Sequence, residues 1–248
     1  MVLALQGSLL VKAFAPRMLP TAVRGAPSTV NHNIPMNDSV SYRTMSTSRR
    51  SLPSMESYLT EPFVRQLTYA KPLVSMLDDT DQQETAEPYL TAQLSHSDGI
   101  RGFFATYLTT EPPCAADQQT LPVALQKSLG AVEDASDLVS LACMNVIMPT
   151  AMTTMHADAD NQEASRLTAD RGLRVLQHLA TLHPDKVKEQ CEAMLEAIKV
   201  VGKEETEGDD TEDGGVDPEL VAYWQKFYGK WGYETTQLDD IATAIRQV

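Results

Sequence analysis

Apolar residues recur every three or four positions through most of the chain after residue 53, the spacing that places them on one face of an α-helix. In the segment 134–155 they cover nearly the whole circumference of a helix, as in the central helix of a bundle. No segment shows the two-residue alternation of a β-strand, and no repeat of fixed length is apparent. The pattern therefore predicts an all-α protein, a single helical bundle or orthogonal array of about seven to nine helices.

Prolines, glycines and acidic runs divide this pattern into segments. The expected helices are 54–77, 85–94, one beginning after Ser97 or Asp98, 121–132, 134–155, 162–182, 184–201, 218–231 and 237–248. Pro149 is expected to kink or end its helix, because a proline ring clashes with the carbonyl four residues earlier. The helix 162–182 is amphipathic, so Arg171 and Arg174 are expected to point mostly outward with Arg166.

Two segments lack the helical pattern. Residues 1–53 are rich in Ser, Thr, Arg, Ala and Pro, and residues 203–217 hold eight acids and three glycines. Such compositions cannot bury enough apolar surface to order themselves. The predicted organisation is a disordered leader (1–53), a helical core domain (54–201), a flexible acidic linker (202–217) and an aromatic C-terminal helical pair (218–248) that docks on the core.

Charge changes abruptly at the end of the leader. Residues 1–53 carry a formal charge of about +5, and the remaining residues about −19. A basic, acid-poor leader is typical of an organelle-targeting peptide. The stretch 42–50 (YRTMSTSRR) resembles the region around mitochondrial processing sites, whereas 13–16 (AFAP) resembles the junction of bipartite plastid leaders in algae. The expected location is the mitochondrial matrix, with the plastid as the alternative.

The acidic body argues against nucleic-acid binding, which needs clustered Lys and Arg. No stretch of about 18 uncharged apolar residues is present, so the protein is not expected to be an integral membrane protein. Three isolated cysteines favour neither a disulfide framework nor a zinc site, and no metal or other cofactor is expected. No recognisable catalytic motif occurs, which leaves open whether the protein is an enzyme.

The turn 96–102 is the best candidate for a ligand site. His96, Asp98 and Arg101 lie around two glycines at the expected start of a helix, where backbone N–H groups attract anions. The alternative is a capped turn between helices with Arg101 on the surface. In the ligand hypothesis, four methionines between 144 and 155 would form the pocket floor.

The second candidate is the helix 218–231, which concentrates aromatic side chains. Such residues either cover a groove on the protein itself or anchor a partner, since Trp and Tyr dominate interface energies. The candidates for partner binding or intramolecular docking are Tyr223, Trp224, Phe227, Tyr228 and Trp231.

Together these features predict a non-catalytic, organelle-targeted helical protein that acts as an accessory, assembly or scaffold factor through protein–protein contacts. The alternative is a small helical enzyme or carrier that binds an anionic small molecule at the helix N-terminus 96–102. The sequence leaves the oligomeric state open.

Overall fold

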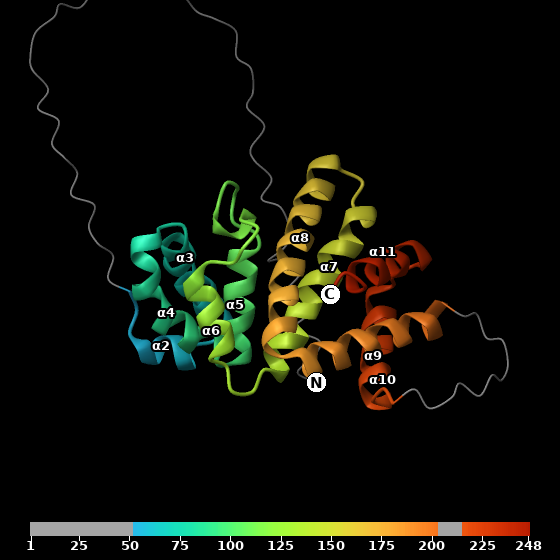
Figure 1. Ribbon diagram of the computed structural model, residues 1–248. Helices are drawn as coiled ribbons and strands as arrows, with labels where there is room; N and C mark the ends of the chain where they lie inside the picture. Colours follow the sequence, from blue (N-terminus) through green and yellow to red (C-terminus); the bar gives the residue numbers. More distant parts are fainter. Residues whose placement is uncertain (1–51, 203–214) are drawn as a thin grey trace, which may run out of the picture.

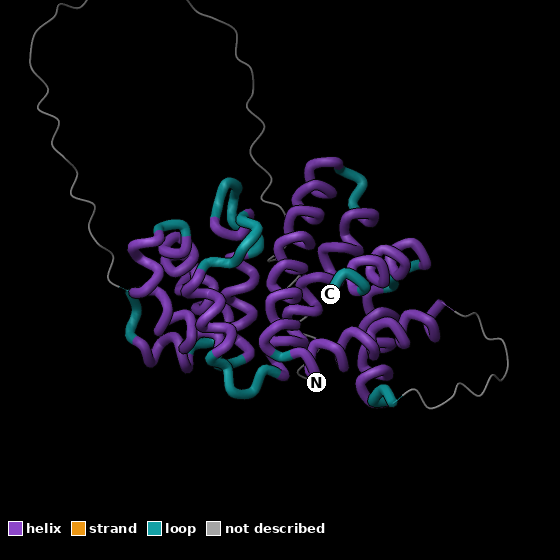
Figure 2. The backbone as a smooth tube through the Cα atoms, in the orientation of Figure 1, coloured by secondary structure: helices purple, strands orange, loops and turns teal. Residues whose placement is uncertain are grey.

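The computed structural model describes residues 52–202 and 215–248. Nearly all of the predicted leader and most of the predicted linker lie outside these residues. Within them the chain forms ten α-helices and one short 3-10 helix, with no strand, which confirms the all-α prediction (Figure 2).

The helices form two groups that follow each other along the chain (Figure 1). The N-terminal half consists of α2 (Met55–Thr60), α3 (Phe63–Leu77), α4 (Thr80–Leu94), α5 (Ser97–Tyr107) and α6 (Val123–Gly130), with the 3-10 helix η1 (Ala115–Asp117) before α6. Its helices pack around α3, α4 and α5.

The C-terminal half consists of α7 (Ser136–Met155), α8 (Ala159–Leu182), α9 (Pro184–Gly202), α10 (Pro218–Trp231) and α11 (Thr235–Ile245). The most extensive helix pairing in the protein joins α7 and α8, and α11 also lies along α7. The two halves meet where α5 packs on α7 and α6 packs on α8. One buried core runs through both.

The first predicted helix, 54–77, is two helices. Glu61 and Pro62 are both extended, with ψ angles of 147° and 162°, and they separate α2 from α3. The reason is that proline disfavours a helical conformation in the residue before it. This break accounts for ten helices where at most nine were expected.

The helix predicted at residues 85–94 begins earlier than expected. The acidic run after Leu77 was expected to separate helices, but α4 already starts at Thr80 because the Asp79 side chain accepts a hydrogen bond from the Asp81 N–H. An aspartate in this position satisfies one of the unpaired N–H groups of the first turn. Pro88 consequently lies inside α4.

Helix α7 continues six residues past Pro149 to Met155, so this proline does not end it. By length and composition, α7 is the one helix in the described ranges that could cross a membrane, and 56% of its apolar window is buried inside the protein. Its packing against α8, α11, α5 and α9 is that of a core helix.

Helices α9 and α10 pack against each other, although they are separated in the chain by the residues 203–217. The Trp224 indole N–H donates to Gln190 Oε1 at 3.0 Å, and the Tyr228 hydroxyl donates to the Met194 carbonyl at 3.4 Å.

Candidate functional site

The turn at residue 96 is a helix cap in which His96 plays the central part. Its Nδ1 accepts a hydrogen bond from the Gly99 N–H at 3.3 Å, and its Nε2 lies 2.8 Å from the Tyr58 carbonyl. These contacts fix the tautomer, with the proton on Nε2. The N-cap of α5 is therefore His96, not Ser97 or Asp98 as the sequence suggested.

The two glycines of this turn permit close contact between helices. A Cβ built on Gly99 would lie 1.8 Å from the Gln93 carbonyl oxygen, and one built on Gly102 would lie 2.5 Å from the Gln66 Cβ. Glycine, which has no Cβ, therefore allows α5 to approach the backbones of α3 and α4 closely.

A buried polar network lies under the same turn. The Gln66 side-chain amide donates to the carbonyls of Ser57, Tyr58 and Glu61, at 3.2, 3.1 and 3.0 Å. The Gln93 amide donates to the Gln66 backbone carbonyl at 2.9 Å and to its side-chain oxygen at 3.1 Å. Both glutamines are fully buried, so these bonds replace the water that the amide N–H groups lose on folding, whereas Gln93 Oε1 has no partner among the described residues.

Arg101 is also held within the protein. Its Nη1 lies 3.1 Å from Asp98 Oδ1, and its guanidinium lies over the Phe63 ring at 4.6 Å from the ring centroid. A cation over an aromatic face gains further stabilisation. His96, Asp98 and Arg101 thus lie near one another as predicted, but each contacts groups of the same chain.

The cluster that sequence reasoning missed surrounds Arg171 on α8. Its guanidinium is 1% exposed and donates to Asp117 Oδ1 from Nε at 2.8 Å and from Nη2 at 2.6 Å. Nη1 donates to the carbonyls of Leu108 and Thr110, and Nη2 lies 3.3 Å from the Cys114 sulfur. We call this set the Arg171 clamp. The prediction that Arg171 points outward is wrong, because its partners lie between Leu108 at the end of α5 and Asp117 in η1, more than 50 residues earlier.

The clamp fixes the loop between α5 and α6 to the C-terminal half. Arg174 adds a bond to the Ala116 carbonyl at 2.8 Å, so it too is turned toward this loop and is half-buried. Burial tends to raise the pKa of Asp117, but hydrogen bonds from Arg171 and the Cys114 N–H outweigh it and hold that pKa below its usual value. Burial raises the pKa of the Cys114 thiol, so the clamp contains a carboxylate and a protonated thiol at neutral pH. A thiol in this state is a poor nucleophile.

The other two cysteines are similarly unreactive. Cys143 is fully buried on α7, and burial raises its pKa well above the usual range. Burial also raises the pKa of Cys191 to about 11. All three thiols are free, and the described residues contain no group of three or more potential metal ligands.

The aromatic helix α10 begins at the Asp217 cap with Pro218 in its first turn and ends at Gly232, whose φ of 65° is left-handed. Trp224 and Tyr228 are fully buried against α9, and Phe227 and Trp231 are half-buried. Tyr223 differs from them, since it remains 39% exposed. The helix therefore presents two different sides, one fixed to the protein and one edge open to solvent.

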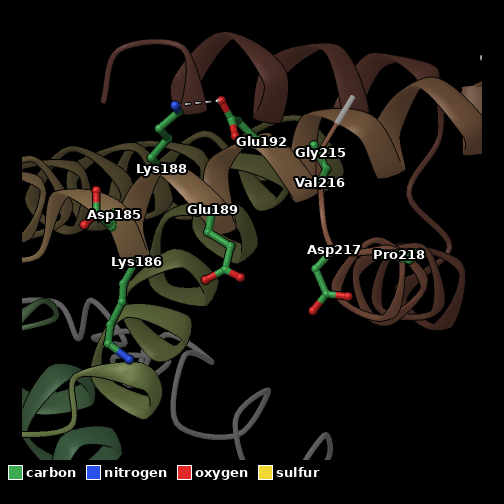
Figure 3. A pocket seen from close by; sticks show the side chains of 9 residues that line it. All are labelled: Asp185, Lys186, Lys188, Glu189, Glu192, Gly215, Val216, Asp217 and Pro218. Carbon is green, nitrogen blue, oxygen red and sulfur yellow. Dashed lines mark ion pairs between the residues drawn. The ribbon is translucent and has the colours of Figure 1, made fainter. Parts of the chain in front are cut away.

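A depression lies elsewhere, between the start of α9 and the segment 215–218 (Figure 3). It measures about 580 Å³ and is open to solvent. Glu189 and Asp217 border it from its two sides, and Lys188 pairs with Glu192 at 3.8 Å. Neither His96, Asp98, Arg101 nor the methionines of α7 line it.

Comparison with known proteins adds one finding. The family model described as "Uncharacterised conserved protein UCP020893" matches residues 63–248, about three quarters of the chain, from the first residue of α3 through α11. Searches of curated proteins and of solved structures found no match.

Proposed function

We propose that this chain, which belongs to the family described as "Uncharacterised conserved protein UCP020893", is a non-catalytic helical accessory or assembly protein of an organelle that acts through protein–protein contacts. The mitochondrial matrix is the proposed location, with the plastid as the alternative.

The contacts that the candidate polar residues make within the chain favour a binding protein over a small enzyme or carrier. His96 caps α5 and bonds the Tyr58 carbonyl, and Arg101 is paired with Asp98 over Phe63. A side chain that already satisfies buried groups of its own chain loses those bonds if it turns to a ligand. The anionic-ligand alternative would have to break this cap.

The proposal rests on α10, in which some aromatic side chains are buried and Tyr223 is exposed. Trp224 and Tyr228 anchor α10 to α9, and this holds Tyr223 at the surface on a rigid element. A tyrosine buries a large area on binding at a low cost in side-chain entropy, which is why tyrosines are frequent at interface hot spots. We assign Tyr223 and the adjoining edge of α10 to the partner contact.

The proposed location is supported by the charge of the chain, which changes sign at residue 53. An organelle-targeting leader is read as a basic segment separate from the folded body.

The partner proposal is tested with Tyr223→Ala in the full chain. Partners of the wild type are captured by cross-linking in isolated organelles, and the variant is expected to lose them while its thermal unfolding stays within about 2 °C of the wild type. Val123→Ala, which removes an exposed side chain from α6, is the matched control and should retain every partner. Retention of all partners by Tyr223→Ala would exclude this edge as the contact.

The proposed organelle location is tested separately. Residues 1–53 fused to a fluorescent reporter are expected to carry it into mitochondria, and a fusion of 54–248 should remain outside. A variant leader with Arg43, Arg49 and Arg50 replaced by Gln is expected to import poorly, because import depends on positive charge. A reporter that stays in the cytosol would refute the proposed location, and one that reaches plastids would select the alternative.

A further inference from the structure

The starts of α7, α9 and α10 lie together and form one surface beside Tyr223. Lys186, in the first turn of α9, donates to Ser136 Oγ at 2.7 Å and pairs with Asp134 at 3.4 Å, which joins the start of α9 to the start of α7. The depression described above continues this surface to the start of α10 (Figure 3). We call the combined surface the helix-start face, and it consists of residues 134–140, 185–192 and 215–223.

Tyr223 is held on this face by contacts with two helices. Burial raises the pKa of its hydroxyl and the charge of Asp137 raises it further, whereas the Ser140 side chain lowers it, so the tip of the side chain lies near the first two turns of α7. Its ring packs against that of Trp224 at 5.1 Å between centroids, with an angle of 77° between the planes. The ring is thus fixed in position while part of its surface stays open to solvent.

The helix-start face carries an excess of negative charge. Lys186 and Lys188 are each already paired with an acid of the same face, and Lys226, one turn after Tyr223, borders it. The partial positive charge of the three helix starts, about half an elementary charge each, offsets only part of the remaining acids. The exposed acids of this face that form no ion pair within the described residues are Asp137, Asp185, Glu189, Asp217 and Glu219.

The depression gives this negative surface a shape. Glu189 and Asp217 extend toward the same open space from its two sides (Figure 3), and the space of about 580 Å³ lies in the range of pockets that hold small molecules. Carboxylates on two walls match an ammonium or guanidinium group that enters between them. Val216 and Pro218 add apolar surface against which the methylene stem of such a side chain can lie. Negative charge therefore coincides here with a hollow and with an exposed aromatic ring.

We propose that the partner binds the helix-start face through a segment rich in Arg and Lys, with one cationic side chain between Glu189 and Asp217 and another over the Tyr223 ring. A cation over an aromatic face is attracted by the ring, and opposite charges steer the two surfaces together. The same charge disfavours nucleic acids and anionic membranes as partners. This inference rests on the proposed contact through Tyr223 and names the chemistry of the partner at that contact.

The first test uses a basic peptide as the probe. The full-length protein is titrated into a labelled peptide of alternating Arg and Ala, and binding is followed by fluorescence anisotropy. The same peptide with Gln in place of Arg should not bind. Raising the salt concentration from about 50 mM to about 500 mM should weaken binding of the Arg peptide about tenfold, because salt screens exposed charges. Failure of the Arg peptide to bind, or equal binding of the Gln peptide, would overturn the inference.

Substitutions test whether the peptide lies on the helix-start face. The double variant Asp137→Asn/Glu189→Gln removes two exposed acids and is expected to weaken binding about fivefold at low salt. The matched control Asp170→Asn/Asp239→Asn removes two exposed acids from α8 and α11, and it should change binding by less than about twofold. Tyr223→Ala is expected to weaken binding about fivefold through loss of the ring. Equal effects of the two double variants would show that the peptide responds to net charge alone, and would overturn the inference.

The organelle cross-linking experiment separates this inference from the proposed function. Both Tyr223→Ala and Asp137→Asn/Glu189→Gln are expected to lose the partners, and the control double variant should keep them. Loss of the partners from Tyr223→Ala alone would overturn the basic-segment inference and leave the contact through Tyr223 intact. Retention of the partners by Tyr223→Ala would refute that contact itself, and the inference with it.

Discussion

The two halves of the molecule bury their helices by different means. In the N-terminal half, glycine brings the backbones of α3, α4 and α5 together, and the glutamines Gln66 and Gln93 satisfy the polar groups enclosed between them. The C-terminal half has one such contact, where Gly172 of α8 lies against the Asn145 carbonyl of α7. Most of its interior is instead filled by bulk, with α7 apolar nearly all round and the rings of Trp224, Tyr228 and Tyr233 closing the space around α10.

This difference predicts different weaknesses. A close backbone contact tolerates no added atom, so the N-terminal half should be sensitive to gain of volume. A core filled by large rings should be sensitive to loss of volume. The junction between them combines the packing of α5 on α7 and of α6 on α8 with one buried, satisfied charge. Both tryptophans of the chain lie on α10, so tryptophan fluorescence reports the C-terminal half, whereas far-UV circular dichroism reports all helices.

The largest effect is expected at the junction. Arg171→Met removes the guanidinium from the Arg171 clamp and leaves the Asp117 carboxylate and the carbonyls of Leu108 and Thr110 without their donors. Breaking a buried pair in this way costs about 4 kcal/mol of unfolding free energy. Urea unfolding followed by fluorescence and by circular dichroism should give two separate transitions, because the halves lose their main polar link.

The matched control for the clamp is Arg166→Met, one turn earlier on α8. Its side chain is 56% exposed and pairs only with the exposed Glu163, so it should cost less than about 1 kcal/mol. Coincident transitions in Arg171→Met, with a loss similar to that of the control, would show that the halves are joined by apolar packing alone.

The N-terminal half is tested by adding one methyl group. Gly99→Ala would place a Cβ 1.8 Å from the Gln93 carbonyl oxygen, a backbone atom that cannot turn aside. We expect a loss of about 3 kcal/mol, measured by urea unfolding. Gly229→Ala on α10 has no atom within 4 Å of the new Cβ and should stabilise by about 0.5–1 kcal/mol, since alanine favours a helix. A neutral Gly99→Ala would refute the close contact between α5 and α4.

The C-terminal half is tested by removing volume. Trp224→Phe keeps an aromatic ring but loses part of the buried indole and its hydrogen bond to Gln190. We expect a loss of about 2 kcal/mol, from the cavity and from the unpaired Gln190 oxygen. Trp231→Phe, a half-buried position on the same helix, should cost less than half as much. If the two variants are equally stable, α10 is not anchored through Trp224.

Local patterns in the sequence predicted the helices well and their junctions less well. The apolar spacing located α7 to α10, and Asp217, Pro218 and Gly232 marked both ends of α10 because caps are read from neighbouring residues. The start of α5 was misplaced because histidine is an uncommon cap. Its role depends on the Tyr58 carbonyl, 38 residues away, which orients the ring.

The Arg171 clamp shows why the site was harder to predict than the fold. On a helical wheel, an arginine between apolar residues of an amphipathic helix is placed on its polar face. Burial of Arg171 becomes favourable only when Asp117 and two loop carbonyls are brought to it by the packing of α6 on α8. A single sequence carries no local signal for such a pairing. Charge, in contrast, is a property of the segment itself, so the predicted leader boundary at residue 53 needs no such long-range information.

The smallest expected effect is a change in the pH dependence of stability, caused by His178 on α8. Burial lowers the pKa of His178 below its ordinary value of 6.5. Above pH 6.5 the imidazole is neutral in both the folded and the unfolded chain, so it has no effect on stability. As the pH falls below 6.5, the unfolded chain takes up a proton that the folded chain resists, and the free energy of unfolding decreases.

His178→Gln is therefore expected to reduce the loss of stability between pH 7.5 and pH 5.5. The difference from the wild type should be about 0.5 kcal/mol or less, because the ring is only half-buried and solvent screens part of the penalty. Urea unfolding at a series of pH values measures it. Thr181→Ala, at an exposed position one turn later that does not titrate, should keep the wild-type slope. A steeper slope in His178→Gln would mean that the folded protein favours the charged imidazole, and that a carboxylate reaches His178 across the junction.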